Sequence, residues 1–108
     1  MLAPEPFRGQ VWDIDFEFGG HPAVILSVNA LNSRLGHVAV VPITGSAGPA
    51  ATHVVLDADA GLTRYDVSYA DVTSMRPVSR DRLLQLRGLV APNEMGEIEE
   101  RLRVYLGL

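Results

Sequence analysis

The sequence predicts a mainly β fold, a small and partly open barrel that packs against one C-terminal amphipathic helix. Apolar and acidic side chains alternate over residues 11–18, which is the period of a half-buried strand. Short apolar segments bounded by turn-forming residues follow at 22–28, 37–44 and 52–57. That many short strands must close on one another to bury their edges, and a helical apolar repeat near the C-terminus supplies a covering helix.

Length and composition indicate one domain, which we expect to span 1–108 with a loose, proline-rich arm at 1–8. Apolar residues make up 47% of the chain and charged residues 20%, a balance that excludes extended disorder. No apolar run is long enough to span a bilayer, and the N-terminus lacks the pattern of a signal peptide. The chain has no cysteine, so disulfides, thiolate catalysis and Cys-based zinc sites are excluded. We therefore expect a cytoplasmic protein that makes no use of a membrane.

The remaining elements follow from local patterns. Gly19-Gly20 marks a turn after the first strand, and residues 29–36 read as a loop or one short helix. Residues 57–66 form a turn-rich connection, and 66–78 carry one or two further strands. Residues 80–90 are divided between a helical turn and a strand.

The C-terminal helix has both a start and a stop signal. Asn93 is a candidate N-cap, and Gly107 is a plausible C-terminal stop. The pairs Glu97–Arg101 and Glu99–Arg103 stand four residues apart, a spacing that stabilises a helix by about 0.2–0.5 kcal/mol per pair. One apolar stripe runs along this helix through Met95, Ile98, Leu102 and Tyr105 or Leu106.

Few residues have a pattern that points to chemistry. Asp13, Asp15 and Glu17 share one face of a strand; they could bind a divalent cation, but a solvated strand face is the better interpretation. His21 follows two glycines at the start of an apolar strand, where a histidine could exchange protons near neutral pH or could merely pack. Thr44 ends its strand before a flexible loop, so its hydroxyl could bind a phosphate oxygen or could simply precede a turn.

The order of the segments resembles the MazF/PemK family of toxin ribonucleases. The segments that carry this likeness are RGQVWDIDF, a glycine-rich loop, HPAVILSVNALN, HVAVVPITGS, THVVL and EIEERLRVYLGL, which together cover residues 8–108. The resemblance implies a barrel-like fold shared with the gyrase poison CcdB, and a homodimer. It also implies cleavage of single-stranded RNA without metal or cofactor, in which the ribose 2′-hydroxyl attacks the adjacent phosphate and leaves a cyclic phosphate and a 5′-hydroxyl.

The resemblance also implies a set of site residues. The family threonine at the end of the third strand matches Thr44, whereas the family arginine before the proline of the second strand is replaced by His21. Histidine is a credible acid–base substitute, although it lacks the bidentate grip of arginine on phosphate. His21 and Thr44 are therefore the catalytic candidates. The RNA-binding candidates are Gly19 and Gly20 in a flexible loop that gates the groove, Asn29, Asn32, Arg34, Ser46 and Asp71.

Three functions remain open from the sequence. The first is an endoribonuclease toxin, inhibited by a cognate antitoxin whose disordered tail folds into the toxin groove. The second is a CcdB-like toxin that binds gyrase, although such toxins typically end in a Trp-containing tripeptide and this chain ends in Leu106-Gly107-Leu108. The third is a catalytically silent paralogue that only binds antitoxin.

Overall fold

The computed structural model describes residues 5–57 and 67–108, and its secondary structure is mainly β, as predicted. The 57–66 connection predicted from the sequence lies almost wholly outside the described residues. Two short 3-10 turns, η2 (Val72–Ser74) and η3 (Arg80–Arg82), flank one of the strands. The strands are β1 (Gln10–Phe16), β2 (Gly19–Ile25), β3 (His37–Thr44), β4 (His53–Leu56), β5 (Ser68–Asp71), β6 (Arg76–Ser79) and β7 (Leu83–Leu89), and the α-helices are α1 (Asn29–Asn32) and α2 (Pro92–Leu106).

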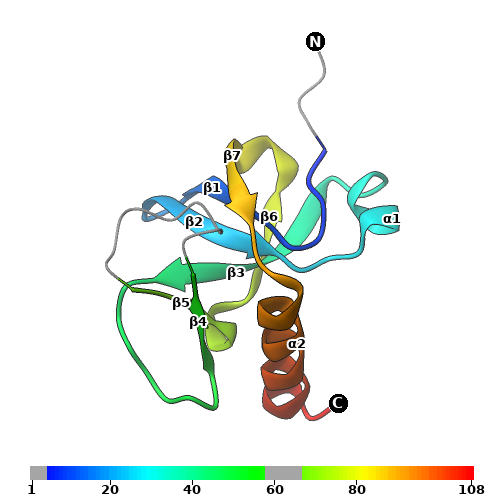
Figure 1. Ribbon diagram of the computed structural model, residues 1–108. Coiled ribbons are helices and arrows are strands. Elements are labelled where there is room, and N and C mark those ends of the chain that lie inside the picture. The colour runs from blue at the N-terminus through cyan, green and yellow to red at the C-terminus, as the bar shows by residue number, and fades with distance from the viewer. Residues whose placement is uncertain (1–4, 58–66) are drawn as a thin grey trace.

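All strand pairs are antiparallel, in the order β4-β5-β3-β2-β1-β7, and β6 pairs with β3 beside this path. The long strand β3 therefore contacts β2 along one edge, and β5 and β6 at its two ends. Because η3 joins β6 directly to β7, the two ends of the β6-β3-β2-β1-β7 sheet are brought back toward each other. The result is the partly open barrel that the sequence predicts, with α2 packed beside it (Figure 1).

Two apolar clusters fill the two sides of the central strands. Val11, Val24 and Val41 belong to the cluster beneath α2, which also contains Ile98 of that helix. Trp12 and Ile14 belong to the cluster on the opposite face. Strands β2 and β3 are thus buried on both faces where they meet, which explains their nearly continuous apolar sequences, whereas β1 keeps one acidic, less buried face beyond Trp12.

Helix α2 begins earlier than the sequence predicts. Asn93 is not the N-cap: Ala91 occupies that position and Pro92 the first turn, where the missing proline amide costs nothing. The amide of Ala91 instead donates to the Glu94 side chain, at 2.8 Å, which satisfies the helix end from inside. Gly107 ends the helix in the left-handed conformation, with φ of 74°, as predicted.

Only one of the two predicted ion pairs on α2 forms. Arg101 Nη1 lies 3.9 Å from Glu97 Oε1. Glu99 pairs instead with Arg8, with 2.8 Å between Nη2 and Oε2, because Arg8 lies against the helix and also donates to the carbonyl of Leu26. Arg103 consequently pairs with Glu100, at 3.6 Å.

The N-terminal arm is less loose than expected. Residues 1–4 lie outside the described part, but Pro6 is fully buried and the amide of Arg8 donates to Asn29 Oδ1 at 2.7 Å. The predicted division of residues 80–90 is confirmed, since η3 precedes β7. In the described part of the chain, no helix is both long enough and apolar enough to cross a membrane.

Candidate functional site

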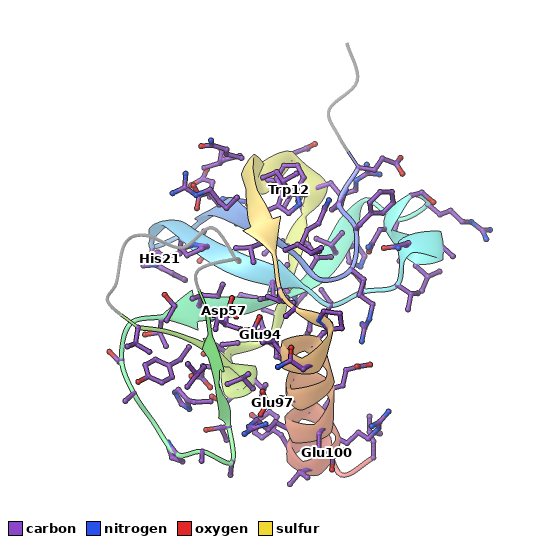
Figure 2. The ribbon with its side chains drawn as sticks, in the orientation of Figure 1. Trp12, His21, Asp57, Glu94, Glu97 and Glu100 are labelled. Atoms are coloured by element: carbon purple, nitrogen blue, oxygen red, sulfur yellow. The ribbon has the colours of Figure 1, made fainter. Side chains whose placement is uncertain are left out.

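His21 lies on β2, at the end of the β1–β2 hairpin that points away from α2 (Figure 2). It pairs with Ile14 across the hairpin and precedes Ala23 and Ile25 by two and four residues. Since side chains two residues apart share a face of a strand, His21 lies on the face of the second apolar cluster, at its margin. The side chain is partly exposed, so it is reachable from solvent yet supported by the sheet.

Thr44 ends the neighbouring strand β3. The β2–β3 pairing ends at Ala23 and Pro42; His21 and Thr44 are each two residues beyond that pair, so they lie at the same end of the two strands and on the same face. Thr44 itself pairs with Tyr69 of β5. The Thr44 hydroxyl oxygen accepts a hydrogen bond from the amide of Ser46, at 3.1 Å, which leaves the hydroxyl proton available to donate.

An arginine and two aromatic rings complete this corner of the molecule. The rings of Phe16 and Phe18 stack in parallel, with centroids 5.1 Å apart and 4° between their planes. The guanidinium carbon of Arg76 lies 5.6 Å and 5.4 Å from the two centroids, and the His21 ring tilts against Phe18 at 5.2 Å. Beside them is a pocket of about 240 Å³ lined by Asp15, Phe16, Glu17, Phe18, Arg76, Pro77, Val78, Ser79 and Arg82.

Arg76 is the site residue that the sequence did not single out. It stands in an arginine-rich stretch at 76–87, and nothing in its local pattern distinguishes it from the other arginines there. Its position follows from the pairing of β6 with β3, in which Arg76 stands opposite Val40. That pairing joins segments about 36 residues apart, beyond the reach of a local pattern.

The two glycines do not form a flexible loop. Gly19 and Gly20 belong to β2 and pair with Phe16 and Asp15, so the turn consists of Glu17 and Phe18 alone. Gly19 has φ of 121°, a conformation that lets so short a connection join two twisted strands. The predicted turn is therefore shifted by two residues, and Phe18 stands at its tip, with its side chain 57% exposed.

Two of the predicted RNA-binding residues hold the backbone instead. Asn32 is 1% exposed, accepts the Ser27 hydroxyl at Oδ1 and donates from Nδ2 to the Ser27 carbonyl. Asn29 accepts the amide of Arg8. Arg34 follows them and is exposed, two residues after the end of α1.

Ser46 is exposed two residues after Thr44, whereas Asp71 is hydrogen-bonded by its neighbours. Partial burial by itself raises the pKa of Asp71, but hydrogen bonds from the hydroxyl and amide of Thr73, the positive charge of His53 and the hydroxyl of Ser74 outweigh it and lower that pKa below 3.8. His53 Nε2 lies 3.8 Å from Asp71 Oδ2, and its Nδ1 lies 2.8 Å from the Thr52 hydroxyl. Asp71 thus caps η2 and ties β5 to β4.

The acidic face of β1 is used for ion pairs. Asp13 Oδ2 lies 3.4 Å from Arg87 Nε, and Asp15 Oδ2 lies 3.9 Å from Arg82 Nη1. In the part of the chain that the structure describes, no group of three or more histidines, aspartates or glutamates is placed to hold a metal ion.

Comparison with known proteins identifies the family. The model of the PemK-like, MazF-like toxin of type II toxin-antitoxin systems matches residues 7–106. The chain belongs to the PemK/MazF family. Endoribonuclease MazF1 of Mycobacterium bovis is 31% identical to it over 103 residues, which are 95% of this chain and 94% of the relative. Endoribonuclease MazF9 of Mycobacterium tuberculosis is 29% identical over 114 residues, with 94% and 96% of the two chains covered.

Solved structures of PemK/MazF proteins share the fold. An endoribonuclease in complex with its cognate antitoxin, from a mycobacterial species, superposes with a TM-score of 0.87 at 31% identity, over 95% of this chain and 96% of the other. A second mycobacterial endoribonuclease gives 0.85 at 29% identity, over 100% and 97% of the two chains. These findings confirm the resemblance and the fold class drawn from the sequence, and they favour a PemK/MazF toxin over the CcdB-like alternative.

Proposed function

We propose that this chain is a toxin endoribonuclease that cuts single-stranded RNA without a metal ion. The proposal is supported by His21 and Thr44 lying at the same end and on the same face of the neighbouring strands β2 and β3, with His21 near an arginine held against two aromatic rings. Two relatives that match this chain over nearly their whole length are named endoribonucleases, which supports the same activity here.

In the proposed reaction the neutral imidazole of His21 accepts the proton of the ribose 2′-hydroxyl. The 2′-oxygen then forms a bond to the adjacent phosphorus, and the bond from phosphorus to the 5′-oxygen breaks. The 5′-oxygen takes a proton from a water molecule, and the hydroxide so formed takes the proton held by His21, which leaves a cyclic phosphate, a 5′-hydroxyl end and a neutral imidazole. The Thr44 hydroxyl, fixed by the Ser46 amide, donates to a phosphoryl oxygen as negative charge grows there.

The proposed partners are a cognate antitoxin and a second copy of the chain, in the cytoplasm where messenger RNA is found. One similar structure holds an endoribonuclease together with its cognate antitoxin, which supports an antitoxin with a disordered tail for this chain. A homodimer is supported by β7, which ends the strand order and exposes Leu84, Leu86 and Leu89 by 60%, 44% and 58%. A strand edge with exposed leucines gains stability when a copy covers it.

The deciding experiment is cleavage of a long single-stranded RNA in excess EDTA, with every new 5′ end mapped. The wild type should give discrete cuts with 5′-hydroxyl ends. His21→Ala should lower the rate about 100-fold or more, the usual contribution of a general base, and Thr44→Val should lower it by removing the donated hydroxyl proton. His37→Ala is the matched control, because His37 is an exposed histidine at the opposite end of β3.

Other outcomes distinguish the alternatives. Intact RNA at high protein concentration would contradict the proposal, and capture of the antitoxin alone or of gyrase would then identify a silent paralogue or a gyrase-binding toxin. Normal cleavage by His21→Ala would contradict the assigned base but leave the nuclease in place.

A further inference from the structure

In the described part of the chain, most arginines are paired with carboxylates. Among the described residues, every arginine except Arg34 and Arg76 has a carboxylate oxygen within 3.9 Å. The chain carries a net charge of −4, so an arginine without such a partner is unusual in its setting. Arg34 lies near the short helix α1, whereas Arg76 lies at the corner that holds His21.

Arg76 is also held in place without being neutralised. Its guanidinium lies against both phenyl rings of the stacked pair, a contact worth about 0.5–1 kcal/mol at an exposed site. Its Nε donates to the carbonyl of Ser74, at 3.3 Å. The rings and one carbonyl orient the group and leave its Nη hydrogens for an anion, since arginine carries donors on several nitrogens. Because the guanidinium is already oriented, little side-chain conformational entropy is lost when an anion binds to it.

Phe18 links this arginine to the proposed catalytic histidine. Its ring centroid lies 5.4 Å from Arg76 Cζ and 5.2 Å from the centroid of the His21 ring. The guanidinium carbon and the imidazole centre are therefore at most 10.6 Å apart, the sum of those two distances. Thr44 ends β3, and Arg76 pairs with the same strand at Val40, four residues before Thr44.

The proposed chemistry needs a lasting positive charge in this corner. A base works in its neutral form, so His21 cannot neutralise the phosphate while it waits to accept a proton. Thr44 supplies a hydrogen bond but no charge. The attacked phosphoryl group gains negative charge in the transition state, and groups already oriented toward it stabilise that charge most.

We propose that Arg76 binds an RNA phosphate at the cleavage site and stabilises its charge, and that the Phe16–Phe18 stack positions Arg76 for this task. The inference rests on the proposed nuclease function. It divides the work of the site: His21 moves the proton, Thr44 orients a phosphoryl oxygen, and Arg76 supplies the charge.

The test compares Arg76→Gln and Arg76→Lys with Arg103→Gln, a matched loss of an exposed arginine on α2 that is paired with Glu100. Arg76→Gln should lower kcat/KM about 100-fold, as removal of one charge-stabilising donor does elsewhere, and Arg76→Lys should recover part of the loss. In a His21→Ala background, which should slow cleavage, Arg76→Gln should reduce the slope of log binding constant against log salt by about 0.7, one phosphate contact with a single strand. Thermal unfolding of each variant separates loss of fold from loss of charge.

The positioning role is tested by a double-mutant cycle with Phe18→Leu. If Phe18 acts through Arg76, Phe18→Leu should lower kcat/KM in the wild type and have little further effect in Arg76→Gln. Wild-type cleavage with an unchanged kcat/KM and salt slope in Arg76→Gln would overturn the inference and leave the nuclease proposal standing. A wild type that cuts no RNA would overturn the nuclease proposal itself.

Discussion

Both carboxylate oxygens of Asp71 are contacted by other side chains or amides, from the turn that follows β5 and from β4. Oδ1 accepts from the amide and hydroxyl of Thr73, and Oδ2 accepts from Ser74 and lies near His53. The sequence proposed this residue for RNA binding because of its place along the chain. Its contacts assign it a structural task, to hold η2 and the β4–β5 pair in position.

We expect Asp71→Ala to lower the free energy of unfolding by about 1 kcal/mol at pH 7, the usual cost of losing a capping side chain. The folded-state pKa of Asp71 is lowered, so its contribution is complete above the unfolded pKa of about 3.9 and is lost as pH falls through the folded value. Denaturant unfolding of the wild type and Asp71→Ala should therefore differ at pH 7 and converge on acidification.

Asp71→Asn serves as the control, since asparagine keeps an acceptor for the Thr73 amide but loses the charge. A gap between wild type and Asp71→Ala that is constant from pH 7 down to pH 2 would show that the ionised form is not what stabilises the fold.

At the scale of elements, the β1–β2 hairpin decides where the site lies. Its turn contains only Glu17 and Phe18, and Gly19 adopts a positive φ to close it. The hairpin presents Phe18 at its tip and His21 three residues later, so the local geometry of one glycine places two site residues. A two-residue hairpin turn stands where the sequence suggested a glycine loop.

Gly19 and Gly20 form a matched pair for testing this turn. An added Cβ meets nothing within 4 Å at either position, so only backbone conformation separates them. We expect Gly19→Ala to cost about 1–3 kcal/mol, the strain of a side chain in a region reserved for glycine, and Gly20→Ala to change stability by about 0.5 kcal/mol or less. Equal unfolding free energies for the two variants would contradict the tight turn.

The elements that the sequence predicted well are those with a local cause. The alternation of β1, the stop at Gly107 and the division between η3 and β7 all follow from neighbouring residues. The start of α2 was missed because Pro92 and Glu94 together satisfy the helix end and make the Asn93 side chain unnecessary as a cap.

The residues of the candidate site also fall into those that local patterns predicted and those that depend on distant pairings. Resemblance and strand patterns placed His21 and Thr44 on neighbouring strands, and the pairing of β2 with β3 puts them at the same end and on the same face of those strands. The position of Arg76 depends on the pairing of β6 with β3, and the His53–Asp71 contact depends on the register of β4 with β5. Asn32 is buried and hydrogen-bonded to Ser27, which its place in a polar segment did not reveal. Hydrophobic periodicity carries no information about such partners.

At the scale of the whole molecule, the leucines of β7 expose apolar surface along a strand edge. We expect the wild type to sediment as a dimer, and Leu84→Glu with Leu86→Glu to sediment as a monomer, because two carboxylates would be buried unpaired in the interface. Leu31→Glu is the control, since Leu31 is similarly exposed, at 45%, but lies on α1. A dimer that survives the β7 changes and dissociates with Leu31→Glu would move the interface to α1.

The pairing of Arg8 with Glu99, and of β1 with β7, has a consequence for synthesis of the chain. The β1–β2 hairpin and β3 can form as they leave the ribosome, since they are adjacent in sequence. The partners of β1 and of the N-terminal arm are made last, so the barrel gains its final edge only when translation is almost complete. A nascent chain interrupted before residue 76 would hold His21 and Thr44 without the arginine beside them. The three residues of the proposed site are therefore present together only after most of the polypeptide has been synthesised.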